Sequence, residues 1–382
     1  VLGGWLALRC GPKRVLLTAV FLWSLATLLT PAAAAADFGA LVAARVLIGM
    51  GEGLLLPCLH ALAVRWVPRD ERSTAAALMT SGQFIGSVCA LLAAPLIEQW
   101  WRYAFYLFGA VGLVWCPCFA LLAASTPEAH GCVSPAELRL IRGGGKCHPG
   151  GLAGADAAAT TRHDNGGVEL GGGDDGVAAA AVAAAPQAAV PWRKLLTSRA
   201  SVAIFVAHAT HNWGWYLLLS WLPAYLTQQG ARLTQAGFLT LLPHVTAALL
   251  SNGGAAFTDR VLLGRLRLPM AAARKRMNAA AQFGPGVAFA ALAALAASGA
   301  TAAPPPAGAP PPPPGEEATT ASGALAASTI FATAAVGLGA LTHSGFWANL
   351  MDVAPRHTGV LLGISNTMAT FPGILCNLTA GA

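Results

Sequence analysis

Long runs of apolar residues without charge recur along the chain, and each is close to the roughly 20 residues that cross a bilayer as a helix. The strict polar–apolar alternation of a β-barrel strand is absent, so the spans are expected to be helices. After a short apolar stub at Val1–Trp5, nine spans are predicted. Their ranges are 14–33, 38–64, 73–97, 103–124, 202–226, 236–257, 277–297, 325–350 and 360–382.

Two segments interrupt this pattern. Residues 125–199 are rich in glycine and alanine and predict a flexible linker, while residues 304–314 are nearly all proline and predict polyproline II. The expected organisation is an N-terminal transmembrane half at 1–124, a linker at 125–199 and a C-terminal transmembrane half at 200–382. We expect an all-α membrane protein with two pseudo-symmetric six-helix halves, here a fragment lacking helix 1, most of helix 2 and helix 12.

Composition agrees with a membrane protein, since 55% of residues are hydrophobic and 10% are charged, against about 25% charged in soluble domains. The net charge of +7 is carried by short connections between spans and therefore indicates topology rather than nucleic-acid binding. In the expected register, 20 of the 23 basic residues lie on one side, which we call the basic side and assign as cytoplasmic or stromal. Arg102 and Arg232 lie on the other side, and Arg45 is within a span.

The eight cysteines show no CxxC pair, and most lie in apolar spans, where a free thiol behaves as a small hydrophobe. A metal site could be drawn from His130, Cys132, Cys147 and His148, but their spacing fits no standard zinc pattern. We expect no metal, no cofactor and, because no catalytic triad or phosphate-cradling loop is present, no enzyme activity.

Six motifs in order resemble solute carrier family 17, the anion/cation symporters of the major facilitator superfamily. They are 4–14 (GWLALRCGPKR), 45–60 (RVLIGMGEGLLLPCLH), 66–73 (WVPRDERS), 211–223 (HNWGWYLLLSWLP), 346–356 (FWANLMDVAPR) and 363–367 (GISNT). The fourth motif is closest to the plant and algal phosphate branch. The resemblance implies the major facilitator fold and secondary transport of anions.

It also implies gating residues in two related loops. Gly4, Arg9, Gly11 and Lys13 match the loop after helix 2, and Asp259 with Arg260 matches its counterpart after helix 8. Leu8 stands where the family usually has the aspartate of a charge network that closes the cytoplasmic side, and Pro12 replaces a usual glycine.

Two charged residues lie inside one predicted helix. Arg45 and Glu52 are seven residues apart and therefore share a face, about 10 Å apart along the axis. A charge at this depth costs at least ~2.5 kcal/mol, so both should face a cavity or a partner. Arg45 offers a fork of donors that suits an anion, and Glu52 can take up the coupled proton. The alternative is that both only bridge neighbouring helices.

Histidines add further candidates. His60 either extends the proton path from Glu52 or is an interfacial histidine. His208 and His211 share a face of the next half's first helix. The family resemblance places His211 at a substrate-binding position, so we expect His211, Asn212 and Trp215 to line the anion site and His208 to pack.

Other polar and small residues are assigned to structure. The pairs Gly49/Gly53 and Gly82/Gly86 predict close helix approach, and Asp352 is expected to cap a helix or pair with Arg356.

The sequence therefore predicts a multi-pass, monomeric carrier of a small anion, inorganic phosphate, coupled to H⁺ or Na⁺, in a plastid envelope or thylakoid membrane. Two alternatives stay open: a carrier of organic anions such as ascorbate, glutamate or sialate, and a non-transporting, degenerate fragment.

Overall fold

The computed structural model describes residues 1–142, 190–298 and 316–380, with helices throughout and no strand in these ranges. Most of the predicted linker and the proline-rich segment lie outside the described residues. The described ends of the linker form short helices, η2 (Pro127–Ala129), α5 (Pro135–Ile141) and α8 (Trp192–Thr197).

The N-terminal half contains α1 (Leu2–Cys10), α2 (Pro12–Ala36), α3 (Phe38–Trp66), η1 (Arg69–Glu71) and α4 (Arg72–Leu122). Asp37 separates α2 from α3 and caps α3, because its Oδ1 accepts from the N–H of Ala40 at 2.9 Å. The helix α4 joins two predicted spans across a kink at Trp100, whose φ/ψ of −128°/37° is not helical.

The C-terminal half contains α9 (Arg199–Gln228), α10 (Leu233–Leu239), α11 (Leu241–Ala256), η3 (Phe257–Arg265), α12 (Met270–Ala297), α13 (Glu316–Gly339), η4 (Ala340–His343), α14 (Phe346–Val353), η5 (Pro355–His357) and α15 (Thr358–Ala380). Two predicted spans are broken. The span 236–257 becomes α10, α11 and the π-helix η3, and the span 325–350 becomes α13, the 3₁₀ turn η4 and α14.

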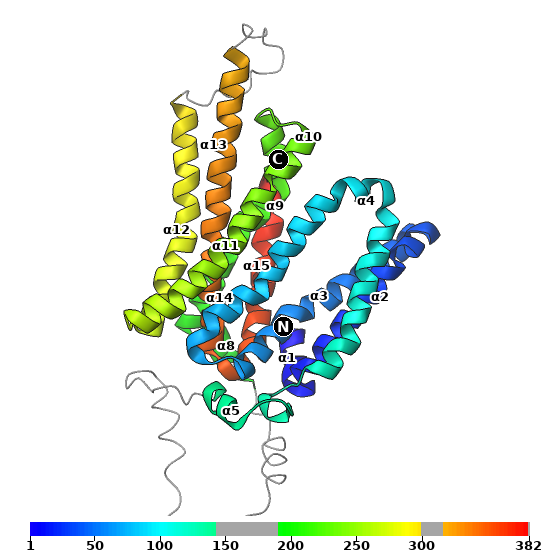
Figure 1. The fold of residues 1–382 in the computed structure, drawn as a ribbon, viewed down its shortest axis with the longest axis vertical. Coiled ribbons are helices and arrows are strands. Elements are labelled where there is room, and N and C mark those ends of the chain that lie inside the picture. Colours follow the sequence, from blue (N-terminus) through cyan, green and yellow to red (C-terminus); the bar gives the residue numbers. More distant parts are fainter. Residues whose placement is uncertain (143–189, 299–315, 381–382) are drawn as a thin grey trace, which may run out of the picture.

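Seven segments of the described chain are long and apolar enough to cross a membrane. The helices α9 and α11 are not among them, because α9 carries His208, His211 and Asn212 and α11 has only 16 residues. Both nevertheless run inside the bundle beside α15, α13 and α4 (Figure 1). Large apolar side chains such as Phe38 and Phe283 stand on the outer faces, as expected where lipid replaces water.

The two halves meet at the basic side, where α1, α8 and α14 come together at one end of the bundle (Figure 1). The helices α1 and α3 pack on α15, and the first part of α4 packs on α11. Toward the other end, the kinked top of α4 diverges from α12 and α13 (Figure 1). The observed architecture is therefore two helical halves joined at one side.

Candidate functional site

A buried charge cluster joins the halves at the basic side. Nη1 of Arg72 at the start of α4 donates to Asp352 Oδ1 at 2.9 Å and to the carbonyl of Met351 at 2.8 Å. Nε of Arg274 in α12 donates to Asp352 Oδ2 at 2.9 Å. Only 4% of Arg72 and 2% of Arg274 is exposed, so one carboxylate is the shared partner of two buried guanidinium groups. The expected pairing of Asp352 with Arg356 is wrong, because both carboxylate oxygens are taken by arginines of other helices.

Arg274 makes two further contacts that close the cluster. Its Nη1 donates to the hydroxyl of Ser73 in α4 and to the carbonyl of Ser344 at 3.3 Å. This cluster was not predicted from the sequence. The signal was present, since Arg72, Arg274 and Asp352 all belong to the basic side, but the pairing requires knowing which connections of the two halves meet.

Asp259 lies beside this cluster and also crosses between the halves. Its Oδ2 accepts from the backbone N–H of Thr74 at 2.9 Å and from the Thr74 hydroxyl at 2.8 Å. Thr74 is in the first turn of α4, where backbone N–H groups lack helical partners and a negative charge is favourable. A carboxylate of the C-terminal half thus caps a helix of the N-terminal half, while Arg260 is exposed on η3.

The first loop motif is mostly helical, which corrects its assignment as a loop. Gly4 and Arg9 are in α1, and only Gly11, with φ of 83°, forms the turn before α2. Gly4 is buried where α1 crosses α15, so close that an added Cβ would overlap the backbone of Gly359. The charged members stay within their own half: Arg9 stacks over Trp5 at 4.4 Å, and Lys13 Nζ donates to the carbonyl of Ala120 at 2.7 Å.

Arg45 and Glu52 both lie on an exposed face of α3. The guanidinium carbon of Arg45 is 5.1 Å from the ring centre of Phe105 in α4, a cation–π contact within the N-terminal half. Neither residue belongs to an ion pair in the described part of the chain. The structure thus places them on one helix face, as predicted, but does not bring them together with His211.

The remaining predicted residues lie on α9 and α3. Asn212 is buried and its Nδ2 donates to the carbonyl of Ala369 in α15 at 3.1 Å, which ties two helices together. Trp215 packs edge-on against Phe84 of α4 at 6.0 Å. His211 stacks near Trp215, with ring centres 6.5 Å apart. His60 is fully buried near Trp347 of α14 rather than beside Glu52.

The glycine pairs predicted to pack closely do not do so. A Cβ built on Gly49, Gly53, Gly82 or Gly86 meets nothing within 4 Å. Close approach occurs instead at Gly51, where a Cβ would lie 2.9 Å from the carbonyl oxygen of Ala19. Gly51 lies on the face of α3 that packs on α2. Gly49 and Gly53 are each two positions away along the helix and therefore lie on a different face.

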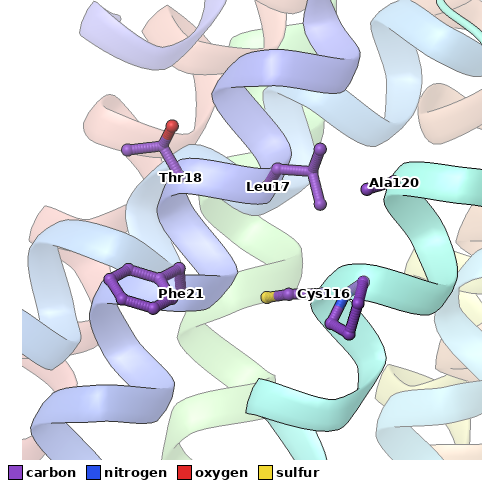
Figure 2. A pocket seen from close by; sticks show the side chains of 6 residues that line it. Leu17, Thr18, Phe21, Cys116 and Ala120 are labelled. Atoms are coloured by element: carbon purple, nitrogen blue, oxygen red, sulfur yellow. The ribbon is translucent and has the colours of Figure 1, made fainter.

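A groove of about 370 Å³ opens between α2 and the second part of α4. It is lined by Leu17, Thr18, Phe21, Cys116, Pro117 and Ala120 (Figure 2). The single hydroxyl, on Thr18, already donates to the carbonyl of Arg14 at 3.1 Å. An apolar groove without free donors suits hydrocarbon rather than an anion. A second cavity, of about 20 Å³, lies beside Trp215 and His244 and holds no more than one water.

Comparison with known proteins identifies the family. The sequence profile of the Major Facilitator Superfamily matches residues 1–376. The chain belongs to the Major Facilitator Superfamily. Its fold agrees, since the proton:xylose symporter XylE superposes with a TM-score of 0.54 over 98% of this chain and 81% of that structure, at 14% identity. Such low identity bears on the fold alone.

Relatives in this superfamily include two chloroplast proteins of Arabidopsis thaliana. Sodium-dependent phosphate transport protein 1 is 31% identical over all of this chain and 62% of its own length. The ascorbate transporter is 28% identical over all of this chain and 59% of its own length. The chain thus spans about three-fifths of the relatives that it matches.

Proposed function

We propose that the chain forms most of a secondary active carrier that moves a small anion, inorganic phosphate, across a plastid membrane with H⁺ or Na⁺. The observation that carries the proposal is the contact between the halves. The Arg72–Asp352–Arg274 cluster and the Asp259 cap hold the basic side closed through polar contacts. Polar contacts that cross an interface can be exchanged for water when the halves rock, which alternating access requires.

Arg45 supports an anionic substrate. It is an arginine in the interior of α3, exposed and outside any ion pair of the described residues. Its guanidinium fork matches the geometry of phosphate or carboxylate. The names of the chloroplast relatives support the same substrate class and the plastid location. His211 and Trp215 are proposed to lie along the substrate path.

A second candidate substrate is an organic anion. The ascorbate transporter matches the whole chain nearly as well as the phosphate transporter. A planar, partly apolar anion would also be suited by the aromatic side chains around His211.

Uptake into proteoliposomes tests both candidates. The full-length protein is reconstituted, and labelled phosphate and labelled ascorbate are supplied with an inward H⁺ or Na⁺ gradient. Phosphate accumulation that collapses when one gradient is dissipated supports the proposal and identifies the ion. Accumulation of ascorbate alone favours the second candidate, and no gradient-driven uptake of either anion rejects a coupled carrier for both.

A further inference from the structure

Four histidines from both halves surround the rings of Trp347 and Phe346 in α14. They are His60 of α3, His208 and His211 of α9, and His343 of η4. The span 325–350 is broken at η4, and this break creates the arrangement. It directs His343 and the start of α14 toward the contact between the halves.

The distances show that the rings form one cluster. The centre of the Trp347 ring lies 4.9 Å from His208, 5.5 Å from His60 and 6.2 Å from His343. His211 lies 6.0 Å from Phe346, which itself lies 5.4 Å from Trp347. A protonated imidazole within about 6 Å of a tryptophan ring gains cation–π stabilisation.

Hydrogen bonds fix where a proton can be added. Nδ1 of His60 lies 3.0 Å from the carbonyl of Leu56, and a carbonyl only accepts, so Nδ1 carries the hydrogen. The other nitrogen, Nε2, is then a lone-pair acceptor, and it is buried without a hydrogen-bond partner. Nε1–H of Trp347 is a buried donor that also lacks a partner. Each such group costs free energy unless a ligand or water satisfies it.

Among the residues that the structure describes, the charged and titratable groups packed around these rings include no carboxylate free to pair with a protonated histidine, since Glu52 of α3 lies on the exposed face of that helix. These groups are His244 in α11, Arg72 in α4, Arg274 in α12, Asp352 in α14 and His357 in η5. Asp352 is the one acid among them, and two arginines already hold it. A proton added to the histidines therefore creates a cation that an incoming anion would have to neutralise. No group of metal-ligating side chains suited to an ion is found in the described ranges.

We propose that this cluster is the proton-loading site of the carrier and that it binds a proton together with a small oxyanion such as phosphate. The oxyanion accepts hydrogen bonds from Trp347 Nε1–H and from the protonated Nε2 of His60. The inference deepens the proposed function and rests on it. It places the coupled proton on the histidines rather than on Glu52. Of these histidines, His60 lies about 22 Å along α3 from Arg45, so the proposed path has two separate anion-binding positions.

The position of the histidine cluster links it to the Asp352 contacts that hold the basic side closed. Trp347 and Asp352 belong to the same eight-residue helix, α14. An anion and proton bound at Trp347 would displace this short helix and loosen the Asp352 contacts with Arg72 and Arg274. Binding at one site would thereby bias the two-state contact between the halves.

Transport by three variants of the full-length protein tests the proton assignment. His60→Gln cannot take up a proton at Nε2, Glu52→Gln removes the competing carboxylate, and His130→Gln is the control because His130 lies between α4 and α5, outside the histidine cluster, where its ring contacts Leu122 and Trp66. We expect His60→Gln to lower ΔpH-driven phosphate accumulation at least about tenfold and to flatten the pH profile of phosphate exchange. A wild-type pH profile in His60→Gln, with loss of coupling in Glu52→Gln, would overturn the proposal.

Fluorescence separates this inference from the function. The difference between wild type and Trp347→Phe isolates one indole, which a neighbouring imidazolium quenches. We expect its emission to change with pH, and we expect phosphate to shift the midpoint of that change to higher pH. A phosphate-shifted titration in a protein that does not transport would support the histidine site and contradict the proposed transport function.

Transport without any pH dependence of this emission would support the transport function and contradict the histidine site. A titration that phosphate does not shift would contradict the binding of an oxyanion at this site.

Discussion

At the scale of single residues, Asp352 forms buried ion pairs with arginines of two other helices. Arg45 and Glu52, by contrast, belong to no ion pair in the described ranges. The two arrangements have different energetics. A buried pair that loses one partner leaves an uncompensated charge, which is costly, whereas a charge that faces open space is available to a ligand. Pairing therefore separates the arginines that join the halves, Arg72 and Arg274, from Arg45, which is proposed to bind substrate.

Replacement of Asp352 by asparagine should destabilise the protein strongly. The change leaves Arg72 and Arg274 buried without a counter-charge, and loss of one partner of a buried pair costs about 3–5 kcal/mol. Thermal unfolding of the purified full-length protein in detergent measures the effect. An unchanged melting temperature would show that the cluster contributes nothing to stability.

Glu128→Gln is the matched control, since it breaks the exposed ion pair of Glu128 with Arg142, which should be worth about 1 kcal/mol or less. Partial burial raises the pKa of Glu128, but hydrogen bonds from its own backbone and from Arg142 lower it overall. The small contribution of this pair is therefore present above the ordinary glutamate pKa and is lost as the pH falls.

Arg45→Lys should raise the apparent KM for the transported anion several-fold or abolish uptake. Lysine keeps the charge but loses the two-pronged contact with an oxyanion, which is worth about 1–3 kcal/mol. Arg102→Lys, at an exposed position stacked on Trp101, is the control. Concentration-dependent uptake in proteoliposomes provides the measurement, and wild-type kinetics in Arg45→Lys would remove Arg45 from the substrate path.

At the scale of helices, seven of the nine predicted spans correspond to long apolar helices in the described ranges, but the sequence did not show how several of them break. Hydropathy does not reveal that residues 325–350 bend at η4, where the chain then passes so close to α12 that a Cβ added to Gly345 would lie 2.9 Å from the Cα of Asn278. The same limit applies to the candidate site. Periodicity placed Arg45 and Glu52 on one face of α3, whereas the meeting of His60, His208 and His343 at Trp347 depends on packing between the halves.

Gly4→Ala should weaken the crossing of α1 and α15, because an added Cβ overlaps the Gly359 backbone and the helices have to separate. Gly53→Ala is the control at a helical glycine with open space around it, where alanine should be neutral or stabilising by about 0.5–1 kcal/mol. The two variants are compared by their melting temperatures and by the rates at which thiols on the basic side are alkylated. Equal behaviour of the two variants would show that the crossing tolerates a side chain.

At the scale of the whole molecule, the halves are joined at one side by the packing of α3 on α15 and of α4 on α11, and by two further kinds of contact. The Asp352 cluster and the Asp259 cap are polar, and the α1–α15 crossing is a close backbone contact. Each is short-ranged and is lost entirely when the surfaces part by a few ångströms. An interface of this kind has two discrete states, closed or separated, rather than a continuous range.

A cross-link across this interface should therefore stop transport reversibly. Thr74 and Asp259 are in direct contact through two hydrogen bonds, so cysteines at both positions can be bridged by a short bifunctional thiol reagent. The bridge holds α4 against η3 and keeps the basic side closed, so substrate cannot be released there. Phosphate uptake is measured in the same double variant before bridging, after bridging and after reduction, with Thr74→Cys alone as the control for reagent effects. We expect uptake to fall to background on bridging and to return on reduction.

Because the two cysteines in contact report only the closed state, the yield of cross-link should also fall when the substrate is present on both sides and the halves exchange between states. Uptake that continues at the unbridged rate in fully cross-linked protein would show that this contact persists throughout the cycle, and the separation of the halves would then have to occur without opening at α4 and η3.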